Sequence, residues 1–554
     1  MSVRHRLGHA VLNRVVAAGG RRFVRDSHAL ERVQRARLAG LVRRVAQARR
    51  HPSLPPVNGD WRWEEFSRAL PVTDYRDWSA PVEAQRRWQE GALINSPVMR
   101  YQPTSGSTSE IKWVPYTREF LHELDGAIAP WLHDLYRQFP GIRRGSHYWS
   151  VSWLPDGMRD SGQSHLNDDM KVLTGGKRLL AAMTQSVPEL IALARTSDDA
   201  QFATLAWLVA DAQLTVLSVW SPSFALTLFE RLVDWRDELI DALRHGDWGH
   251  RRVALPDRLR CPRAPQAAAL LAEWDGQLTA DFFLRLWPRL ALVSAWDTAA
   301  AAPWATLLQR LLPQAAFQGK GLWATEGVVT VPCQGQWVLA YQSHVYEFED
   351  LDSGRILPPW ALRPGQEVAP LLSTGSGLLR YRLNDRLRVD SHLNSLPVLR
   401  FLGRNDGVDM VGEKIGAVYV QQVLDALPWG ETLRPVTLLA ARQSNSAGKP
   451  GYVLLVECAG ASAPQSAVQR IRERLETALA QHFHYQLARG LGQLAPARVV
   501  CRQDMREFYL HQCRLRGMIE GNIKIEPLRD WPEVLPPALH DVSDARGSLS
   551  GCVI

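Results

Sequence analysis

A loop rich in small hydroxyl side chains surrounds one glycine, and a lysine, Lys112, follows it closely. The residues of this loop are Ser105, Gly106, Ser107, Thr108 and Ser109. Hydroxyl groups and unhindered backbone N–H groups can bind phosphate oxygens. The spacing is not that of a P-loop, because Ile111 precedes Lys112 and Trp113 follows it. Taken alone, these residues fit both a phosphate-binding loop and an ordinary turn.

Three later stretches each combine a charged side chain with turn-forming residues. Glu326 lies in a glycine-rich stretch, Asp385 lies between arginines, and Arg404 opens a stretch dense in Asp and Gly. Each stretch alone fits a surface turn or an ion pair. The chain uses arginine far more than lysine, so a lysine that is kept within a motif is informative. The motif lysines are Lys112, Lys320, Lys414 and Lys524.

The apolar patterns around these residues predict the elements that carry them. Strands are expected over 146–154, 214–220, 290–296, 327–350 and 378–402. Helices are expected over 28–50, 200–213 and 222–244. Beyond residue 403 the chain starts again with a strand over 436–441, a strand over 452–458 and a helix over 464–483. The mixture predicts an α/β or mixed α+β fold with a second, smaller α+β unit.

The order and spacing of the charged stretches resemble those of adenylate-forming enzymes, the superfamily of acyl-CoA synthetases, peptide-synthetase adenylation domains and luciferases. From about residue 30 to about 535, the chain more closely resembles the auxin-responsive acyl-acid amido synthetase family (the Gretchen Hagen family), especially its bacterial members. The matching segments are 71–75, 219–224, 318–332, 377–382 and 411–415. The segment 318–332 is the most specific of these.

The resemblance implies an ATP- and Mg²⁺-dependent ligase. Such an enzyme joins a carboxylic acid to AMP and releases pyrophosphate, and an amine, usually that of an amino acid, then attacks the acyl-adenylate to form an amide. A second interpretation keeps the adenylate but transfers the acyl group to coenzyme A or another thiol. A third is a degenerate nucleotide-binding or scaffold protein, which the charged residues Glu326, Asp385, Arg404 and Lys524 argue against.

The resemblance also implies where ATP binds. The loop Ser105–Ser109, with Lys112, would hold the phosphates, and Trp323 and Ala324 would lie near the adenine. Asp385 would accept hydrogen bonds from the ribose hydroxyls, a role that suits an ionised carboxylate. Arg404 would bind ribose or phosphate.

Three residues carry the implied catalysis. Thr325 would face the α-phosphate or the adenylate, and Glu326 would help to hold Mg²⁺, an ion that prefers oxygen ligands and substrate phosphates. Lys524 stands at the position of the family's C-terminal lysine, and its ammonium group would stabilise the charge that develops between the carboxylate and the α-phosphate. On its own sequence context, Lys524 also fits a solvated loop lysine.

The acyl pocket is expected to be lined by aromatic side chains. The candidates are Trp149, Trp153, Trp207 and Trp220. Because the chain contains 21 tryptophans, core packing is an alternative for each of them. An apolar, aromatic pocket favours an aryl or alkyl carboxylic acid, with an amine or amino acid as the second substrate.

The length of 554 residues exceeds the 250–300 or so that one hydrophobic core usually serves, so at least two domains are expected. With the resemblance, this predicts a large N-terminal domain over 1–402 that binds ATP and the acyl group, with β-sheets flanked by helices. A small, mobile α+β domain over 403–554 would carry Lys524, with a hinge over 403–409.

Positive charge is concentrated at the start of the chain. Residues 1–50 contain thirteen arginines and only two acidic residues, a net charge of +11, whereas the whole chain carries +8. This basic helical segment fits either an arm for nucleic acid or anionic lipid or a solvated helix face, and we favour the solvated face, with no nucleic-acid partner.

The sequence contains no run of 18 apolar residues and no secretory leader, and its six cysteines lack metal or redox spacing. We therefore expect a cytoplasmic protein without a membrane span, a monomer or weak dimer.

Overall fold

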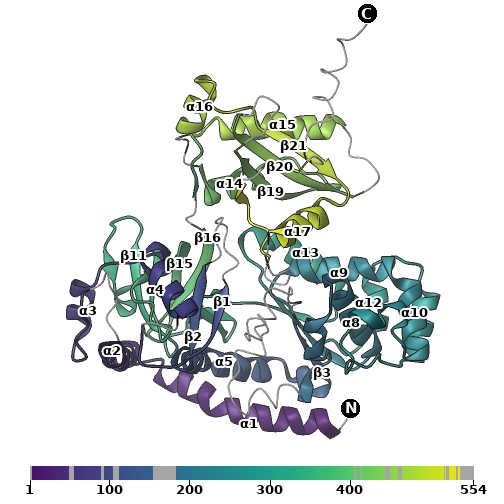
Figure 1. The fold of residues 1–554 in the computed structure, drawn as a ribbon, viewed down its shortest axis with the longest axis horizontal. Helices are drawn as coiled ribbons and strands as arrows, with labels where there is room; N and C mark the ends of the chain where they lie inside the picture. The colour runs from purple at the N-terminus through teal and green to yellow at the C-terminus, as the bar shows by residue number, and fades with distance from the viewer. Residues whose placement is uncertain are drawn as a thin grey trace, which may run out of the picture. The chain divides into compact units, whose positions relative to one another are not determined.

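The computed structural model describes two compact units, shown in Figure 1. The first unit comprises residues 1–105, 111–401 and 519–523, and the second comprises 106–110, 402–518 and 524–554. The described residues are 3–48, 55–88, 93–103, 112–151, 153, 183–404, 407–411, 413, 415–442, 449–459, 465–516, 518, 523–531, 534–536 and 539. The predicted mixed α/β architecture is confirmed.

The first unit begins with two helices, α1 (Val3–Asp26) and α2 (Leu30–Ala46). Helix α1 buries one apolar face, which includes Leu12, Val16 and Phe23, and it packs along α5 (Arg118–Gln138). The helices can approach closely because a Cβ atom on Gly19 would lie only 2.8 Å from the Cβ atom of Ala129. The basic segment thus forms amphipathic helices on which most of the described arginines are exposed. Helices α3 (Trp63–Ala69) and α4 (Tyr75–Trp88) follow.

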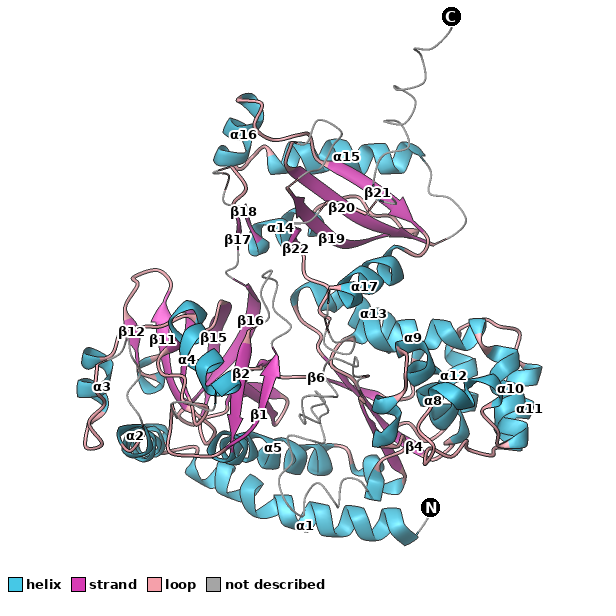
Figure 2. Ribbon diagram, viewed as in Figure 1, coloured by secondary structure: helices cyan, strands magenta, loops and turns pink. Residues whose placement is uncertain are grey.

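A four-stranded parallel sheet forms one layer of this unit (Figure 2). Its strands pair in sequence order and are β3 (Ser146–Trp149), β4 (Leu214–Ser218), β5 (Leu292–Ala295) and β6 (Ala316–Gly319). The crossovers include α8 (Ser197–Ala210), α9 (Pro222–Asp234), α10 (Arg236–His245), α11 (Pro265–Glu273), α12 (Ala280–Leu286) and α13 (Ala302–Leu311). Strand β3 is shorter than the predicted 146–154, because its partner β4 ends at Ser218, opposite Trp149.

A larger sheet of antiparallel pairs lies in the same unit, with the order β12-β11-β13-β15-β16-β10-β9 and β14 paired to β13. Its strands are β9 (Thr330–Cys333), β10 (Gln336–Leu339), β11 (Val345–Asp350), β12 (Ile356–Leu357), β13 (Glu367–Ser373), β14 (Tyr381–Arg382), β15 (Asp385–Leu393) and β16 (Leu396–Arg404). Two short hairpins complete the unit. They are β1 (Val98–Pro103) with β2 (Trp113–Thr117), and β7 (Trp323–Ala324) with β8 (Gly327–Val328).

The second unit is a four-stranded sheet with the order β21-β20-β19-β22, together with a small hairpin of β17 (Gly407–Val408) and β18 (Ile415–Gly416). The central pair is antiparallel and the outer pairs are parallel. The strands are β19 (Leu433–Ala441), β20 (Gly451–Cys458), β21 (Arg498–Arg502) and β22 (Leu528–Trp531). The helices are α14 (Ala417–Asp425), α15 (Gln465–Leu479), α16 (Phe483–Gly490) and α17 (Met505–Leu515). Its core includes Leu438, Tyr452, Leu454, Ile471 and Leu475.

Among the described residues, no helix is both long enough and apolar enough to span a bilayer.

Candidate active site

The hairpin of β7 and β8 places two of the predicted catalytic residues at its turn. Trp323 pairs with Val328 and Ala324 with Gly327, so Thr325 and Glu326 are the two residues that connect the strands. A Cβ atom on Gly327 would lie 2.9 Å from Nε2 of His344, so this position accommodates only glycine without a shift of the histidine. The turn therefore sits directly on buried side chains of the first unit.

Two buried tyrosines hold this turn. The hydroxyl of Tyr116 donates to the carbonyl oxygen of Thr325 (O–O distance 3.0 Å), and the hydroxyl of Tyr381 donates to Oε1 of Glu326 (3.4 Å). Burial raises the pKa of Tyr116 to about 12. Burial, and then the adjacent Glu326 carboxylate, raises the pKa of Tyr381. Both phenols therefore keep their protons at neutral pH and act as hydrogen-bond donors.

A buried histidine supports the hairpin from behind. The backbone N–H of Val328 donates to Nε2 of His344 (3.2 Å), and Nδ1 of His344 lies 2.7 Å from Oε2 of Glu123. The same carboxylate oxygen accepts from the N–H of Gly375 (2.8 Å). Burial lowers the pKa of His344, so the ring is neutral, with its proton on Nδ1 where it can donate to Glu123. The sequence analysis did not single out either residue, because neither lies in a recognisable motif.

A cluster of four tryptophans lies beside this hairpin, and we call it the tryptophan cluster. Its members are Trp131, Trp149, Trp220 and Trp323. The ring centroid of Trp131 lies 5.7 Å from that of Trp149 and 5.7 Å from that of Trp323, and the centroids of Trp220 and Trp323 are 6.0 Å apart. Trp149 and Trp220 were predicted for the acyl pocket and Trp323 for the adenine, so the structure brings these predictions together. Trp131, on α5, was missed.

Lys320 is buried among these rings, immediately after β6. Its Nζ atom lies 4.4 Å from the ring centroid of Trp220 and 5.1 Å from that of Trp131, and it donates to Oγ of Ser218 (2.9 Å). Distances of this kind favour a cation–π interaction with each ring. Ser218, Trp220 and Lys320 all lie at the carboxyl ends of parallel strands, where α/β folds bind their ligands.

An acidic residue also lies at this edge of the parallel sheet. Asp297 follows β5, and the backbone of Gly319 packs against its carboxyl group. Burial raises the pKa of Asp297 to about 6. A carboxyl group with this pKa can gain or lose a proton near neutral pH.

The remaining predicted residues of the first unit lie in different surroundings. The indole N–H of Trp153 donates to the carbonyl of Ala194 (2.8 Å), and Trp207 lies on α8. Among the described residues, neither makes a ring contact with the tryptophan cluster. The Nζ atom of Lys112 lies 5.8 Å from the ring centroid of Tyr75, whose hydroxyl accepts from the N–H of Trp113 (2.7 Å). Asp385, half-buried, begins β15. The predicted phosphate loop, Ser105, Gly106, Ser107, Thr108 and Ser109, lies outside the described residues.

In the second unit, Arg404 and Lys524 both act on one half-buried carboxylate, that of Glu526. Nη1 of Arg404 lies 3.3 Å from Oε1 of Glu526, and Nη2 of Arg529 lies 3.5 Å from Oε2. Burial opposes ionisation of Glu526, but the charges of Arg529, Arg404 and Lys524 together lower its pKa. Arg529 also donates to the backbone carbonyl of Lys524 (3.3 Å). Two residues 120 positions apart are thus gathered around a carboxylate that the sequence analysis did not single out.

Comparisons with known proteins match this chain to one protein family. A family model for the GH3 family N-terminal domain matches residues 21–317, and one for the GH3 family central domain matches residues 337–404. Indole-3-acetic acid-amido synthetase GH3.15 from Arabidopsis thaliana is 22% identical over 380 residues, which cover 63% of this chain and 64% of that protein. The matched region thus spans less than two thirds of the relative's length.

Two solved structures share the fold over nearly the whole chain. The structure of GH3.15 acyl acid amido synthetase matches with a TM-score of 0.72 and 17% identity, covering 92% of each chain. That of AtGH3.15 acyl acid amido synthetase in complex with 2,4-DB matches with a TM-score of 0.74 and 17% identity, covering 92% of this chain and 93% of the other. At these identities the likeness establishes the fold.

Proposed function

The chain belongs to the GH3 family, and on that premise we propose that it is an ATP-dependent acyl-acid amido synthetase. It activates a carboxylic acid as an acyl-adenylate and transfers the acyl group to an amine to form an amide. The observation that carries this proposal is the turn Thr325–Glu326, fixed by buried Tyr116 and Tyr381 directly beside the tryptophan cluster. The fixed carboxylate would hold the metal ion of ATP, and the apolar aromatic wall would bind the acid.

Bond changes in the proposed reaction occur in two steps. In the first, an oxygen of the substrate carboxylate forms a bond to the α-phosphorus of ATP, and pyrophosphate leaves. In the second, the amine nitrogen forms a bond to the carbonyl carbon and loses a proton, and AMP leaves. Adenylation is needed because a free carboxylate would have to expel oxide, a very poor leaving group. Thr325 would face the α-phosphate in both steps.

Glu326 suits a magnesium ion that is shared with substrate. Mg²⁺ is usually held by one or two carboxylates together with substrate phosphates and water. Within the described part of the chain, no three His, Cys, Asp or Glu side chains form a protein-only metal cage. Glu326 would hold such an ion together with the phosphates of ATP, and the ion would neutralise phosphate charge. The hydrogen bond from Tyr381 to Oε1 of Glu326 favours one orientation of the carboxylate.

The residues of the second unit complete the proposed assignment. Lys524 would supply the positive charge of the adenylation step, and Arg404 would bind the ribose or a phosphate. Glu526, whose pKa the nearby positive charges lower, pairs directly with Arg404 and attracts Lys524 through its charge. We also propose that the domain limits are 1–402 and 403–554, with the hinge over 403–409. Asp385, Lys112 and the loop Ser105–Ser109 would bind ATP.

The tryptophan cluster supports an aryl or alkyl acid as the substrate. Large aromatic side chains with few polar atoms are typical of sites for apolar small molecules. Trp149 and Trp220 would contact the acyl group, and Trp323, which joins the cluster to the hairpin, would lie at the adenylate. None of the described cysteines forms a disulfide, and we propose a cytoplasmic enzyme.

The test is acid-dependent exchange between pyrophosphate and ATP, measured with Mg²⁺ and no amine. A panel of aryl, indolyl and fatty acids should contain at least one acid that supports exchange. Amino acids or coenzyme A are then added with that acid, and the products are identified by mass spectrometry. An amide is expected. An acyl-CoA product would contradict the amide assignment, and the absence of exchange with every aryl and alkyl acid would contradict the proposed substrate class.

A further inference from the structure

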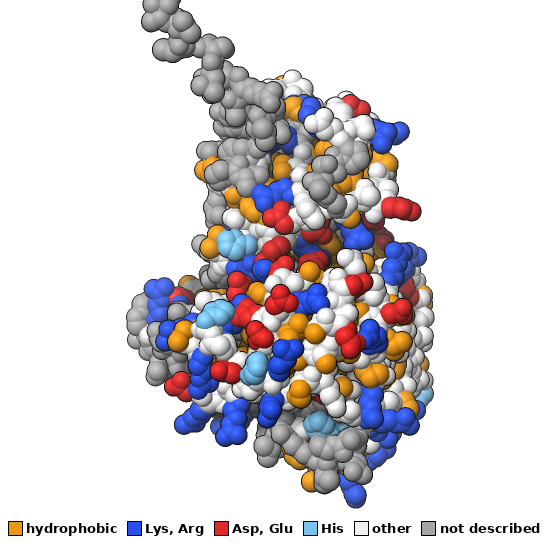
Figure 3. All heavy atoms as spheres, turned by 90° about the vertical axis from the view of Figure 1, so that its right-hand side faces the viewer, with side chains coloured by type: hydrophobic (Ala, Val, Ile, Leu, Met, Phe, Trp, Pro, Cys, Tyr) orange, Lys and Arg blue, Asp and Glu red, His pale blue; other side chains and the backbone are white. Residues whose placement is uncertain are grey.

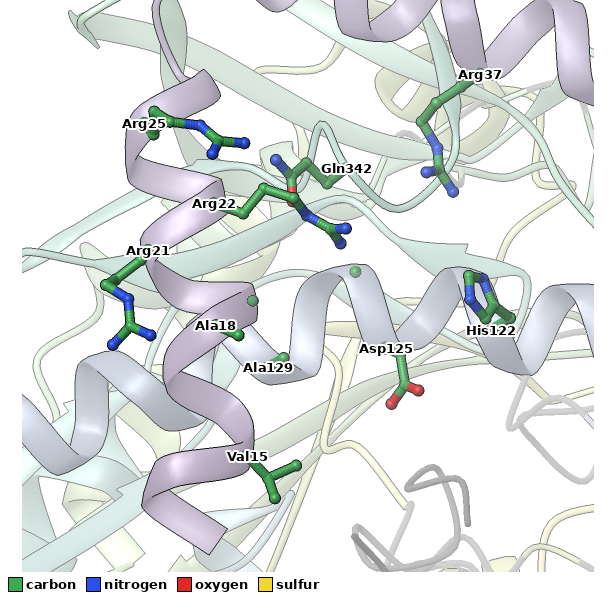
Figure 4. A pocket seen from close by; sticks show the side chains of 12 residues that line it. Val15, Ala18, Arg21, Arg22, Arg25, Arg37, His122, Asp125, Ala129 and Gln342 are labelled. Atoms are coloured by element: carbon green, nitrogen blue, oxygen red, sulfur yellow. The ribbon is translucent and has the colours of Figure 1, made fainter. Parts of the chain in front are cut away.

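A cavity of about 740 Å³ lies in the first unit between α1, α2 and α5 (Figure 4). Its walls carry Arg21, Arg22 and Arg25 from α1 and Arg37 from α2. His122 and Asp125 come from α5. In Figure 4 the guanidinium groups of Arg22 and Arg37 extend into the same space from different helices. The cavity thus gathers part of the basic N-terminal segment, for which the proposed function gives no role.

Small residues form the base of this cavity where α1 crosses α5. Gly19, Gly126 and Ala129 all line it. A Cβ atom on Gly19 would lie 2.8 Å from that of Ala129, and one on Gly126 would collide with the backbone carbonyl of Gln342. The backbones therefore approach as closely as glycine permits, and the longer side chains stand around a space that they do not fill. The volume lies within the range of about 300–1,000 Å³ that is typical of small-molecule sites.

The arginines of the cavity are unequally neutralised. Arg25 forms an ion pair with Asp26 (Nε–Oδ1 distance 2.9 Å). Over the ranges that the structure describes, Arg21, Arg22 and Arg37 have no ion pair or hydrogen bond to a side chain. Burial lowers the pKa of Arg37, and the nearby Arg22 lowers it further, although Glu123 and Glu119 act in the opposite direction. Burial and mutual repulsion therefore destabilise the charged guanidinium groups in this cavity, and a bound anion would offset that destabilisation.

We propose that this cavity binds a small, soluble anion that carries phosphate groups. Planar guanidinium groups match phosphate oxygens two at a time. Arg21, Arg22 and Arg37, with Asp125 as the one carboxylate among the residues that line the cavity, suit a multiply charged ligand. By contrast, acidic and basic side chains are interspersed on the face of the unit that carries α10 and α11 (Figure 3). The proposal is independent of the ligase activity, because it concerns binding at residues outside the candidate active site.

The test is calorimetric titration of the full chain with inorganic pyrophosphate, without Mg²⁺ or ATP. The cavity variant is Arg21→Gln/Arg22→Gln, whose two side chains are exposed, so folding should be retained and can be checked by circular dichroism. The matched control is Arg14→Gln/Arg32→Gln, which removes the same charge from exposed positions of α1 and α2 outside the cavity. We expect the cavity variant to lose about tenfold or more in affinity, and the control to bind as the wild type does. Any binding at the candidate active site contributes equally to the three proteins.

A third variant tests the role of the guanidinium group, and lipid vesicles test whether the phosphate belongs to a lipid headgroup. Arg37→Lys keeps the charge but loses the planar fork, so it should bind more weakly than the wild type. In parallel, the chain is sedimented with phosphatidylcholine vesicles with and without phosphatidic acid. Equal pyrophosphate affinity in the wild type and the cavity variant would overturn the proposal. It would also be overturned by binding to phosphatidic acid vesicles without binding to free pyrophosphate, since that outcome identifies a lipid headgroup site.

Discussion

Two buried histidines predict how acid destabilises the first unit. Nε2 of His147, on β3, lies 2.8 Å from the carbonyl oxygen of Ile142 and donates to it. His9, on α1, bonds through Nε2 to the carbonyl of Gly145 (2.7 Å) and through Nδ1 to the hydroxyl of Tyr136 (2.8 Å), and the two imidazole centroids are 4.6 Å apart. The pair therefore fastens α1 to the edge of the parallel sheet while both rings are neutral.

The magnitude follows from the pKa of His147. Burial, followed by the nearby His9, lowers this pKa from 6.5 to about 3, and burial also lowers the pKa of His9. The unfolded chain therefore binds more protons than the folded chain once the pH falls below 6.5, and the free energy of unfolding decreases with falling pH down to about 3. One pH unit corresponds to about 1.4 kcal/mol per group, so His147 alone should cost roughly 3 kcal/mol between pH 7.5 and 4.5.

The assay is urea unfolding of the wild type and His147→Gln at several pH values from 7.5 to 4.5, followed by tryptophan fluorescence. Glutamine keeps a donor for the Ile142 carbonyl but does not titrate, so the stability difference between wild type and variant should shrink by roughly 3 kcal/mol as the pH falls. His250→Gln, at an exposed histidine, is the control and should track the wild type. Because titrating carboxylates affect all three proteins alike, parallel pH curves for the wild type and His147→Gln would refute the reasoning.

The remaining predictions concern the candidate active site. Glu326→Gln should raise the Mg²⁺ concentration needed for half-maximal pyrophosphate exchange, and an unchanged titration would remove this residue from the metal site. Tyr381→Phe removes one hydrogen bond to a charged group and should slow exchange by about tenfold or more. An unchanged exchange rate would contradict a role for this hydrogen bond in adenylation. Lys524→Ala should abolish adenylation but spare amide formation from a supplied acyl-adenylate, so equal loss of both steps would contradict its role. Trp220→Ala should raise the KM for the acid more than that for ATP, and equal changes would place the acid elsewhere.

Much of the fold could be predicted because its central strands are apolar segments with clear ends. The expected strands over 214–220 and 436–441 correspond to β4 and β19 within a few residues. The expected helix over 222–244 is instead two helices, α9 and α10, which are separated by Trp235. Helical apolar spacing continues on both sides of this break, so periodicity alone could not locate it.

Only part of the candidate active site could be predicted from the sequence. Thr325 and Glu326 are adjacent in one motif, and a turn between two short strands follows from local sequence. The side chains that fix this turn come from positions far along the chain, such as Tyr116 and Glu123, and only the packing brings them together. Glu526 lay two residues from Lys524, but its role depends on Arg404, 122 positions away. Long-range pairs of this kind leave no local pattern to read.

The position of Glu326 follows from a set of hydrogen bonds whose directions are fixed by burial. Burial raises the pKa of Tyr116 and Tyr381, so both phenols donate, and it lowers the pKa of His344, so the ring accepts from the hairpin backbone. These three side chains come from β2, from β14 and from the segment before β11. The turn is thus held in its arrangement before substrates bind, so Glu326 would hold a magnesium ion without reorganisation, and that ion would stabilise the charge that develops at the phosphate. That property is what the proposed adenylation step demands of Glu326.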